Sequence, residues 1–132
     1  MTPDALAALC ARAYTHMAPW SAPALATMLD QPGTILTLSG PAFVLGRVVL
    51  DEAEVLALAT DPDHQRQGHA ARALSGFAAQ ARDRAAERLF LEVAADNAPA
   101  LRFYTRMGLT TAGRRPAYYR RAAAPAADAL IM

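Results

Sequence analysis

Residues 56–76, with the sequence LALATDPDHQRQGHAARALSG, decide how this chain folds. An apolar run over 55–59 gives way to a turn at Thr60-Asp61-Pro62-Asp63, and a helix opens within 65–70. The helix is predicted because apolar side chains recur every three or four residues from Ala70 to Ala81 and so share one face. The segment therefore predicts a strand, a loop and a helix in succession.

Gly68 lies where the first turn of this helix leaves backbone N–H groups without partners. Those groups carry partial positive charge, and glycine has no Cβ to keep a phosphate away from them. The pattern favours a pyrophosphate-binding loop, and an ordinary loop glycine before an amphipathic helix is the simpler alternative. A P-loop is excluded because the chain contains no lysine, and the Gly-x-Gly-x-x-Gly spacing is absent.

Composition indicates a globular protein of one domain, residues 1–132. The chain is 54% hydrophobic and 19% charged, and no apolar run approaches the ~20 residues that span a bilayer. A net charge of +1 gives no electrostatic reason to expect nucleic acid or an anionic membrane as a partner. No basic, apolar leader opens the sequence, so we expect a cytoplasmic protein whose single cysteine, Cys10, lies in the core.

The flanking segments predict further helices and strands. Helices are expected over 3–14, over a short segment opened by Ser21 and Pro23, and over 99–107, where Gly108 ends the helix. Strands are expected over 35–38, 42–50, 88–93, 109–113 and 128–132, with a loop over 114–127. The order strand, helix, strand across 55–93 predicts a parallel pair joined by a right-handed crossover.

Glu92 stands out because it interrupts an apolar strand. A buried carboxylate without partners costs several kcal/mol, so it pairs with an arginine, protonates, or serves a function such as that of a general base. Tyr104 is either a packing aromatic of the next helix or a proton donor to a leaving thiolate. His64 and His69 lack the spacing of metal ligands, and we expect no metal site.

Several segments, in the order of the chain, match one known family. They are Pro19-Trp20-Ser21, 49–53, 60–68, Leu91-Glu92-Val93, Asp96-Asn97-Ala98, 101–109 and 114–132. With the Gln-x-x-Gly-x-Ala loop of 65–70, the sequence resembles the ribosomal-protein-alanine N-acetyltransferases, a branch of the GNAT superfamily. The resemblance implies the α/β GNAT fold, a mixed central β-sheet flanked by helices, with the usual first strand short or missing.

The resemblance also implies roles for individual residues. Glu92 would be the general base and Tyr104 the general acid, and Asn97, which otherwise reads as a helix cap, would bind the pantetheine arm. Trp20, which otherwise reads as a core anchor, would contact the acceptor together with Tyr118 and Tyr119. The donor-binding residues would be Leu58, Ala59 and Thr60 for the acetyl and pantetheine groups, and Arg66, Gln67, Gly68, His69, Ala70 and Ala71 for the pyrophosphate.

The activity so implied is direct transfer of an acetyl group from acetyl-CoA to a primary amine, in particular the N-terminal α-amine of a protein such as a ribosomal protein. An α-amine with a pKa of about 8 costs roughly 1.4 kcal/mol to deprotonate at pH 7, whereas a lysine amine with a pKa of about 10.4 costs roughly 4.6 kcal/mol. This difference favours the α-amine. The alternatives are acetylation of a small-molecule amine and a non-catalytic acyl-CoA-binding module, and we expect a monomer or a weak homodimer.

Overall fold

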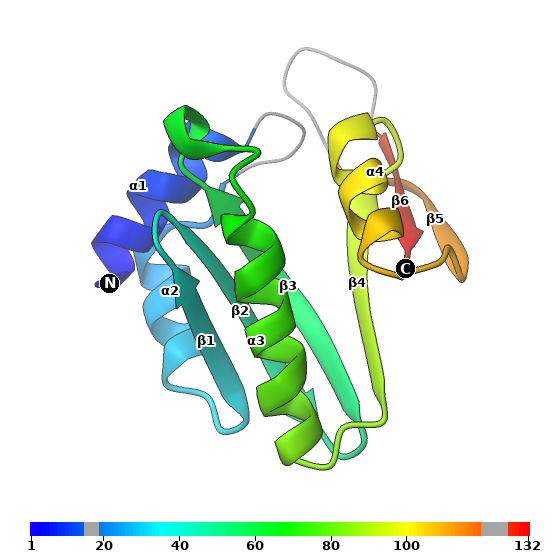
Figure 1. Ribbon diagram of the computed structural model, residues 1–132, viewed down its shortest axis with the longest axis horizontal. Coiled ribbons are helices and arrows are strands. Elements are labelled where there is room, and N and C mark those ends of the chain that lie inside the picture. The colour runs from blue at the N-terminus through cyan, green and yellow to red at the C-terminus, as the bar shows by residue number, and fades with distance from the viewer. Residues whose placement is uncertain (15–18, 120–126) are drawn as a thin grey trace. The chain divides into compact units, whose positions relative to one another are not determined.

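The computed structural model describes residues 1–14, 19–119 and 127–132 (Figure 1). They form two compact units, one from residues 1–14 and 19–89 and the other from residues within 90–132. The prediction that residues 1–132 form a single domain is not tested by this division into two units. The parallel pairing of 55–60 with 88–93 also stays a prediction. In the described ranges, no helix is both long and apolar enough to cross a membrane.

The first unit begins with two capped helices. Its elements are α1 (Pro3–Ala13), α2 (Ala22–Leu29), β1 (Thr34–Ser39), β2 (Ala42–Val49), β3 (Glu52–Thr60), the 3-10 helix η1 (Pro62–His64) and α3 (His69–Asp83). The side chain of Thr2 accepts the N–H of Ala5, and that of Ser21 accepts the N–H of Ala24. Each bond satisfies one of the N–H groups that a helix leaves unpaired at its start, so both predicted helix starts are confirmed.

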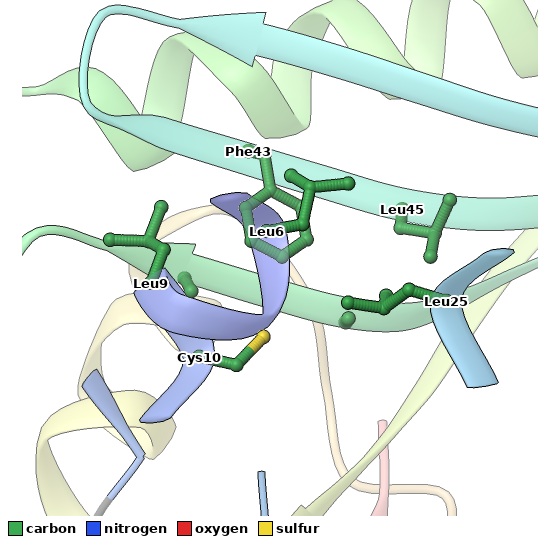
Figure 2. Close-up of a cluster of buried hydrophobic side chains, with 8 residues drawn as sticks. Leu6, Leu9, Cys10, Leu25, Phe43 and Leu45 are labelled. Carbon is green, nitrogen blue, oxygen red and sulfur yellow. The ribbon is translucent and has the colours of Figure 1, made fainter. Parts of the chain in front are cut away.

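Strands β1, β2 and β3 form an antiparallel meander with a buried core on one face. Phe43 lies opposite Ala59, and Leu45 lies opposite Ala57, so these side chains project to the same face. Helices α1 and α2 cover this face, and Figure 2 shows their side chains against β2. The helix residues of the core are Leu6, Leu9, Cys10 and Leu25. The predicted core position of Cys10 is confirmed, and burial raises the pKa of its thiol.

Helix α3 packs on the opposite face of the meander, against β1 and β2. Gly46 leaves room for the ring of Phe77, since a Cβ at Gly46 would lie 2.5 Å from Phe77 Cζ. The buried Thr37 hydroxyl of β1 donates to the Ala73 carbonyl of α3 at 2.8 Å. These contacts fix where the N-terminal end of α3, and therefore its loop, lies on the meander.

The second unit contains most of β4 (Arg88–Ala94), with α4 (Ala98–Arg106), β5 (Gly113–Tyr119) and β6 (Ala127–Ile131). Strand β6 lies between β4 and β5 and pairs antiparallel with both. Asn97 caps the start of α4, because its side chain accepts the N–H of Ala100, and Gly108 follows the helix at a φ of 96°. The helix predicted over 99–107 is thereby confirmed.

The sequence-based prediction was wrong between residues 109 and 119. The strand expected over 109–113 is absent before Gly113, and β5 occupies 113–119, where a loop was expected. This segment is polar and contains Pro116, so it carries no apolar alternation, and its strand conformation depends on hydrogen bonds to β6. Residues 120–126 of the expected loop lie outside the described residues.

Candidate active site

The loop before α3 leaves the start of that helix without a side-chain cap. Gly68 is the N-cap residue at a φ of 82°, in the left-handed region that favours glycine, and no side chain caps the first N–H groups. Arg66 also has a positive φ, of 63°, which costs a non-glycine residue about 1–2 kcal/mol. Uncapped N–H groups at a helix start fit a bound pyrophosphate, and Arg66 lies two residues before Gly68 in the sequence.

Arg72, in the first turn of α3, contacts this loop, and the sequence analysis missed it. Its Nη2 donates to His69 Nδ1 at 2.9 Å and to the Gln67 carbonyl at 3.4 Å, while its Nε donates to Ser39 Oγ at 3.3 Å. Because arginine only donates, His69 Nδ1 accepts, and the ring proton lies on Nε2, which faces Gln67 Oε1 at 3.3 Å. The guanidinium therefore ties the loop to the β1–β2 hairpin. From the sequence, the helical period shows only that Arg72 lies on the exposed face of α3. Its contacts with Gln67 and Ser39 depend on how the loop and the hairpin fold, so the sequence pattern does not show them.

Asp61 anchors the other end of the loop to α1. Its carboxylate accepts two hydrogen bonds from Arg12, at 2.9 and 3.1 Å, and one from the Asp63 N–H at 3.0 Å. The Asp63 N–H and then the Arg12 guanidinium hold the pKa of Asp61 below its ordinary value. The carboxylate is therefore charged at neutral pH. Asp61 thus holds the beginning of the segment between β3 and α3, and Arg72 holds its end at Gln67.

The remaining donor-binding candidates of the first unit lie at the end of β3. Leu58, Ala59 and Thr60 pair with β2, and Ala59 is buried in the core. The backbone role of these three residues toward the donor stays a prediction. Trp20 packs, partly buried, against the core of α1 and α2. This position agrees with a core anchor, and its acceptor role stays a prediction.

Glu92 on β4 forms an ion pair with Arg115 on β5. Arg115 Nε lies 3.0 Å from Glu92 Oε1, and the Glu92 side chain is only 14% exposed. The arginine partner that the sequence left as an alternative is therefore present. Because a guanidinium attracts negative charge, the ion pair offsets part of the cost of burying this carboxylate.

Tyrosines gather in the same unit. The Tyr118 and Tyr119 rings meet edge to face at 5.1 Å, as do Phe103 and Tyr104 at 5.3 Å. Burial, followed by the charge of Glu92, raises the pKa of Tyr119 to about 12. Burial, followed by the neighbouring Tyr119, raises the pKa of Tyr104. Both phenols are therefore protonated at neutral pH, so Tyr104 can donate a proton and cannot act as a base.

The structure thus places the predicted site residues in two groups. The loop residues 66–71, the end of β3 and Trp20 lie in the first unit, whereas Glu92, Asn97, Tyr104, Tyr118 and Tyr119 lie in the second. Asn97 is confirmed as a helix cap. The structure adds one arginine to each group. Arg72 contacts His69 in the first unit, and Arg115 contacts Glu92 in the second, and the sequence pattern revealed neither contact.

Comparison with known proteins assigns the chain to a class of enzymes. Residues 33–109 match the model of the acetyltransferase (GNAT) family. The chain belongs to this family, and it is an acetyl-CoA-dependent N-acetyltransferase.

Its similarity to one group of these enzymes extends over most of the chain. The [ribosomal protein bS18]-alanine N-acetyltransferase of Escherichia coli strain K12 is 36% identical over 122 residues, which cover 89% of this chain and 82% of the relative. The crystal structure of the E. coli enzyme of this name matches with a TM-score of 0.84 at 33% identity, over 98% of this chain and 84% of that one. NAA60 from Arabidopsis thaliana, solved in complex with acetyl-CoA, shares the fold at 15% identity, with a TM-score of 0.79 over 99% of this chain and 93% of that one. The predicted GNAT fold is confirmed.

Proposed function

We propose that this enzyme acetylates the N-terminal α-amine of a protein, and that the acceptor is a ribosomal protein that begins with alanine. The observation that carries the proposal is the 36% identity, over 89% of the chain, to an enzyme named for that acceptor. The burial of Cys10, the chain's single cysteine, supports direct transfer, because a thiol that could carry the acetyl group as a thioester would have to be accessible.

The loop before α3 is proposed to bind the donor. The N–H groups after Gly68 would hold the pyrophosphate, with Arg66 supplying positive charge. The backbone of Leu58 to Thr60 would hold the thioester end, and Asn97 the pantetheine arm. Arg72 would keep the loop in its binding conformation through the contacts to Gln67, His69 and Ser39.

Glu92 and Tyr104 are proposed to move the protons. The amine nitrogen attacks the thioester carbonyl carbon, Glu92 accepts the proton that the amine loses, and the carbon–sulfur bond breaks as the amide forms. The leaving thiolate takes a proton from Tyr104. The phenolate so formed regains a proton from water, and because burial raises the pKa of Tyr104, the phenol is protonated again before the next turnover. Holding both substrates in one complex makes the attack effectively unimolecular.

The test is CoA release from acetyl-CoA with peptides that offer different amines. One peptide has a free N-terminal alanine and no lysine, and its control has the same sequence with a blocked N-terminus and one internal lysine. We expect turnover on the first peptide alone, and mass spectrometry should place the acetyl group on its α-amine. Turnover on the lysine peptide alone, or only on small amines, would overturn the proposed acceptor.

A further inference from the structure

We propose that Arg115 is a positioning residue that holds Glu92 in the orientation required of a general base. This proposal rests on the proposed function, because it takes Glu92 as the base. Arg115 lies 23 residues beyond Glu92 in the sequence. The strand register of the second unit brings the two side chains together.

The register places Glu92 and Arg115 on one face of the β4–β6–β5 sheet. Glu92 lies opposite Ile131 of β6, and Arg115 lies opposite Ala129 of the same strand. Residues two apart on a strand share a face, and so do directly opposed residues. Arg115 and Glu92 are therefore diagonal neighbours across β6, which lets the long guanidinium reach over Ala129, a residue with no bulky side chain.

The ion pair leaves one oxygen of Glu92 available for catalysis. Arg115 Nε contacts Oε1 at 3.0 Å, and within the described part of the chain no hydrogen bond engages Oε2. A carboxylate held through one oxygen presents the other in a fixed direction. Oε2 is then the atom that receives the proton from the amine, either directly or through a water molecule.

Arg115 also contacts a residue proposed to bind the acceptor. Its guanidinium carbon lies 5.4 Å from the centre of the Tyr118 ring, within the range of a cation–π interaction. A planar guanidinium can pair with a carboxylate and stack on a ring at the same time, which an ammonium does less well. Arg115 thereby links the position of the base to that of an aromatic residue on β5.

The neighbouring arginine supplies a matched control. Arg114 forms its own ion pair, with Asp128 at 3.1 Å, and its side chain is 57% exposed compared with 54% for Arg115. Because alternate residues of a strand point to opposite faces, Arg114 lies on the face away from Glu92. Arg114→Met thus removes an equally exposed ion pair of the same sheet without touching the proposed base.

The experiment compares Arg115→Met, Arg115→Lys and Arg114→Met in the native enzyme and in the Glu92→Gln background. It measures kcat, KM for acetyl-CoA and for the N-terminal alanine peptide, CoA affinity by calorimetry, and thermal unfolding. We expect Arg115→Met to lower kcat about ten- to hundredfold, because misplacing a reacting group by about 1 Å has an effect of that size. KM for acetyl-CoA and CoA affinity should not change.

Two further results are expected from the same series. Arg115→Lys should recover part of the lost kcat, because it restores the charge but not the planar geometry. In the Glu92→Gln background, Arg115→Met should have no further effect, since the group that it positions is already gone. Arg114→Met should leave kcat unchanged.

The proposal is overturned if Arg115→Met keeps the native kcat, if Arg114→Met lowers kcat equally, or if Arg115→Met lowers kcat equally in both backgrounds. Failure of the positioning role alone would appear as an inactive Glu92→Gln enzyme together with a fully active Arg115→Met enzyme. Failure of the proposed base would appear as unchanged turnover in Glu92→Gln itself, and the role of Arg115 would fall with it.

Discussion

Phe77 of α3 occupies the space that a side chain at Gly46 of β2 would need. A Cβ at Gly46 would lie 2.5 Å from Phe77 Cζ and 2.3 Å from the Glu54 carbonyl oxygen. The carbonyl belongs to the paired strand β3 and cannot rotate away, so we expect Gly46→Ala to lower the free energy of unfolding by about 3 kcal/mol. Chemical denaturation followed by circular dichroism measures the loss.

Gly76 of α3 is the control for this substitution. A Cβ at Gly76 would meet Thr37 Cγ2 at 3.8 Å, an ordinary van der Waals contact. Gly76→Ala should therefore stabilise the protein by up to about 1 kcal/mol, because alanine favours a helix interior over glycine. If Gly46→Ala is as stable as the native protein, the Phe77 ring does not pack against Gly46 as closely as this distance requires.

Gly68→Ala tests the pyrophosphate loop. The φ of 82° disfavours alanine, and its Cβ would lie 3.0 Å from Arg72 Nη1, on the guanidinium that holds the loop. We expect affinity for acetyl-CoA to fall about tenfold, equivalent to about 1.4 kcal/mol, in isothermal titration calorimetry.

Gly108→Ala separates loop geometry from general strain. Gly108 also has a positive φ, of 96°, but nothing lies within 4 Å of its Cβ position. It should lose about 1 kcal/mol of stability and keep its affinity for acetyl-CoA. If Gly68→Ala binds acetyl-CoA as tightly as the Gly108→Ala protein does, the loop is not the pyrophosphate site.

Glu92→Gln tests the general base. The amide keeps the shape of the side chain but cannot take a proton, so we expect turnover to fall about ten- to thousandfold while CoA affinity is preserved. Glu54→Gln is the control, because Glu54 also pairs with an arginine, Arg47, at 3.3 Å, but lies in the first unit. An equal loss in both variants would point to lost ion pairing rather than lost base catalysis.

The Tyr119 phenol should make stability depend on alkaline pH. Its pKa is raised from 10.0 to about 12 in the folded protein, so the folded state holds this proton more tightly than the unfolded chain does. The contribution is complete below pH 10 and is lost as the pH rises toward about 12. It amounts to about 3 kcal/mol, at about 1.4 kcal/mol for each unit of pKa.

Denaturation of the native protein and Tyr119→Phe across this pH range measures the effect. We expect the native protein to lose stability more steeply than Tyr119→Phe, with Tyr118→Phe, which alters the exposed ring beside it, behaving like the native protein. Parallel curves for all three proteins would mean that Tyr119 ionises in the folded state as readily as in the unfolded chain.

The sequence by itself determined the elements whose cause is local. Thr2, Ser21 and Asn97 cap helices because each side chain bonds an N–H three residues later. The apolar stripe of 70–81 likewise predicts α3, and the turn residues after Thr60 predict its loop. Both signals come from residues only a few positions apart in the sequence. Glu92 was recognised as unusual for a similar reason, because a charge within an apolar run is visible without any partner.

Only the tertiary structure decided which distant groups meet. Strand β5 exists because β6 offers it hydrogen bonds, and its own sequence of 113–119 has no strand pattern. The same register brings Arg115 to Glu92, while the folding of the loop onto the β1–β2 hairpin brings Arg72 to Ser39. These contacts depend on how the strands pair and how the loop folds, so they cannot be predicted from a periodic pattern in the sequence.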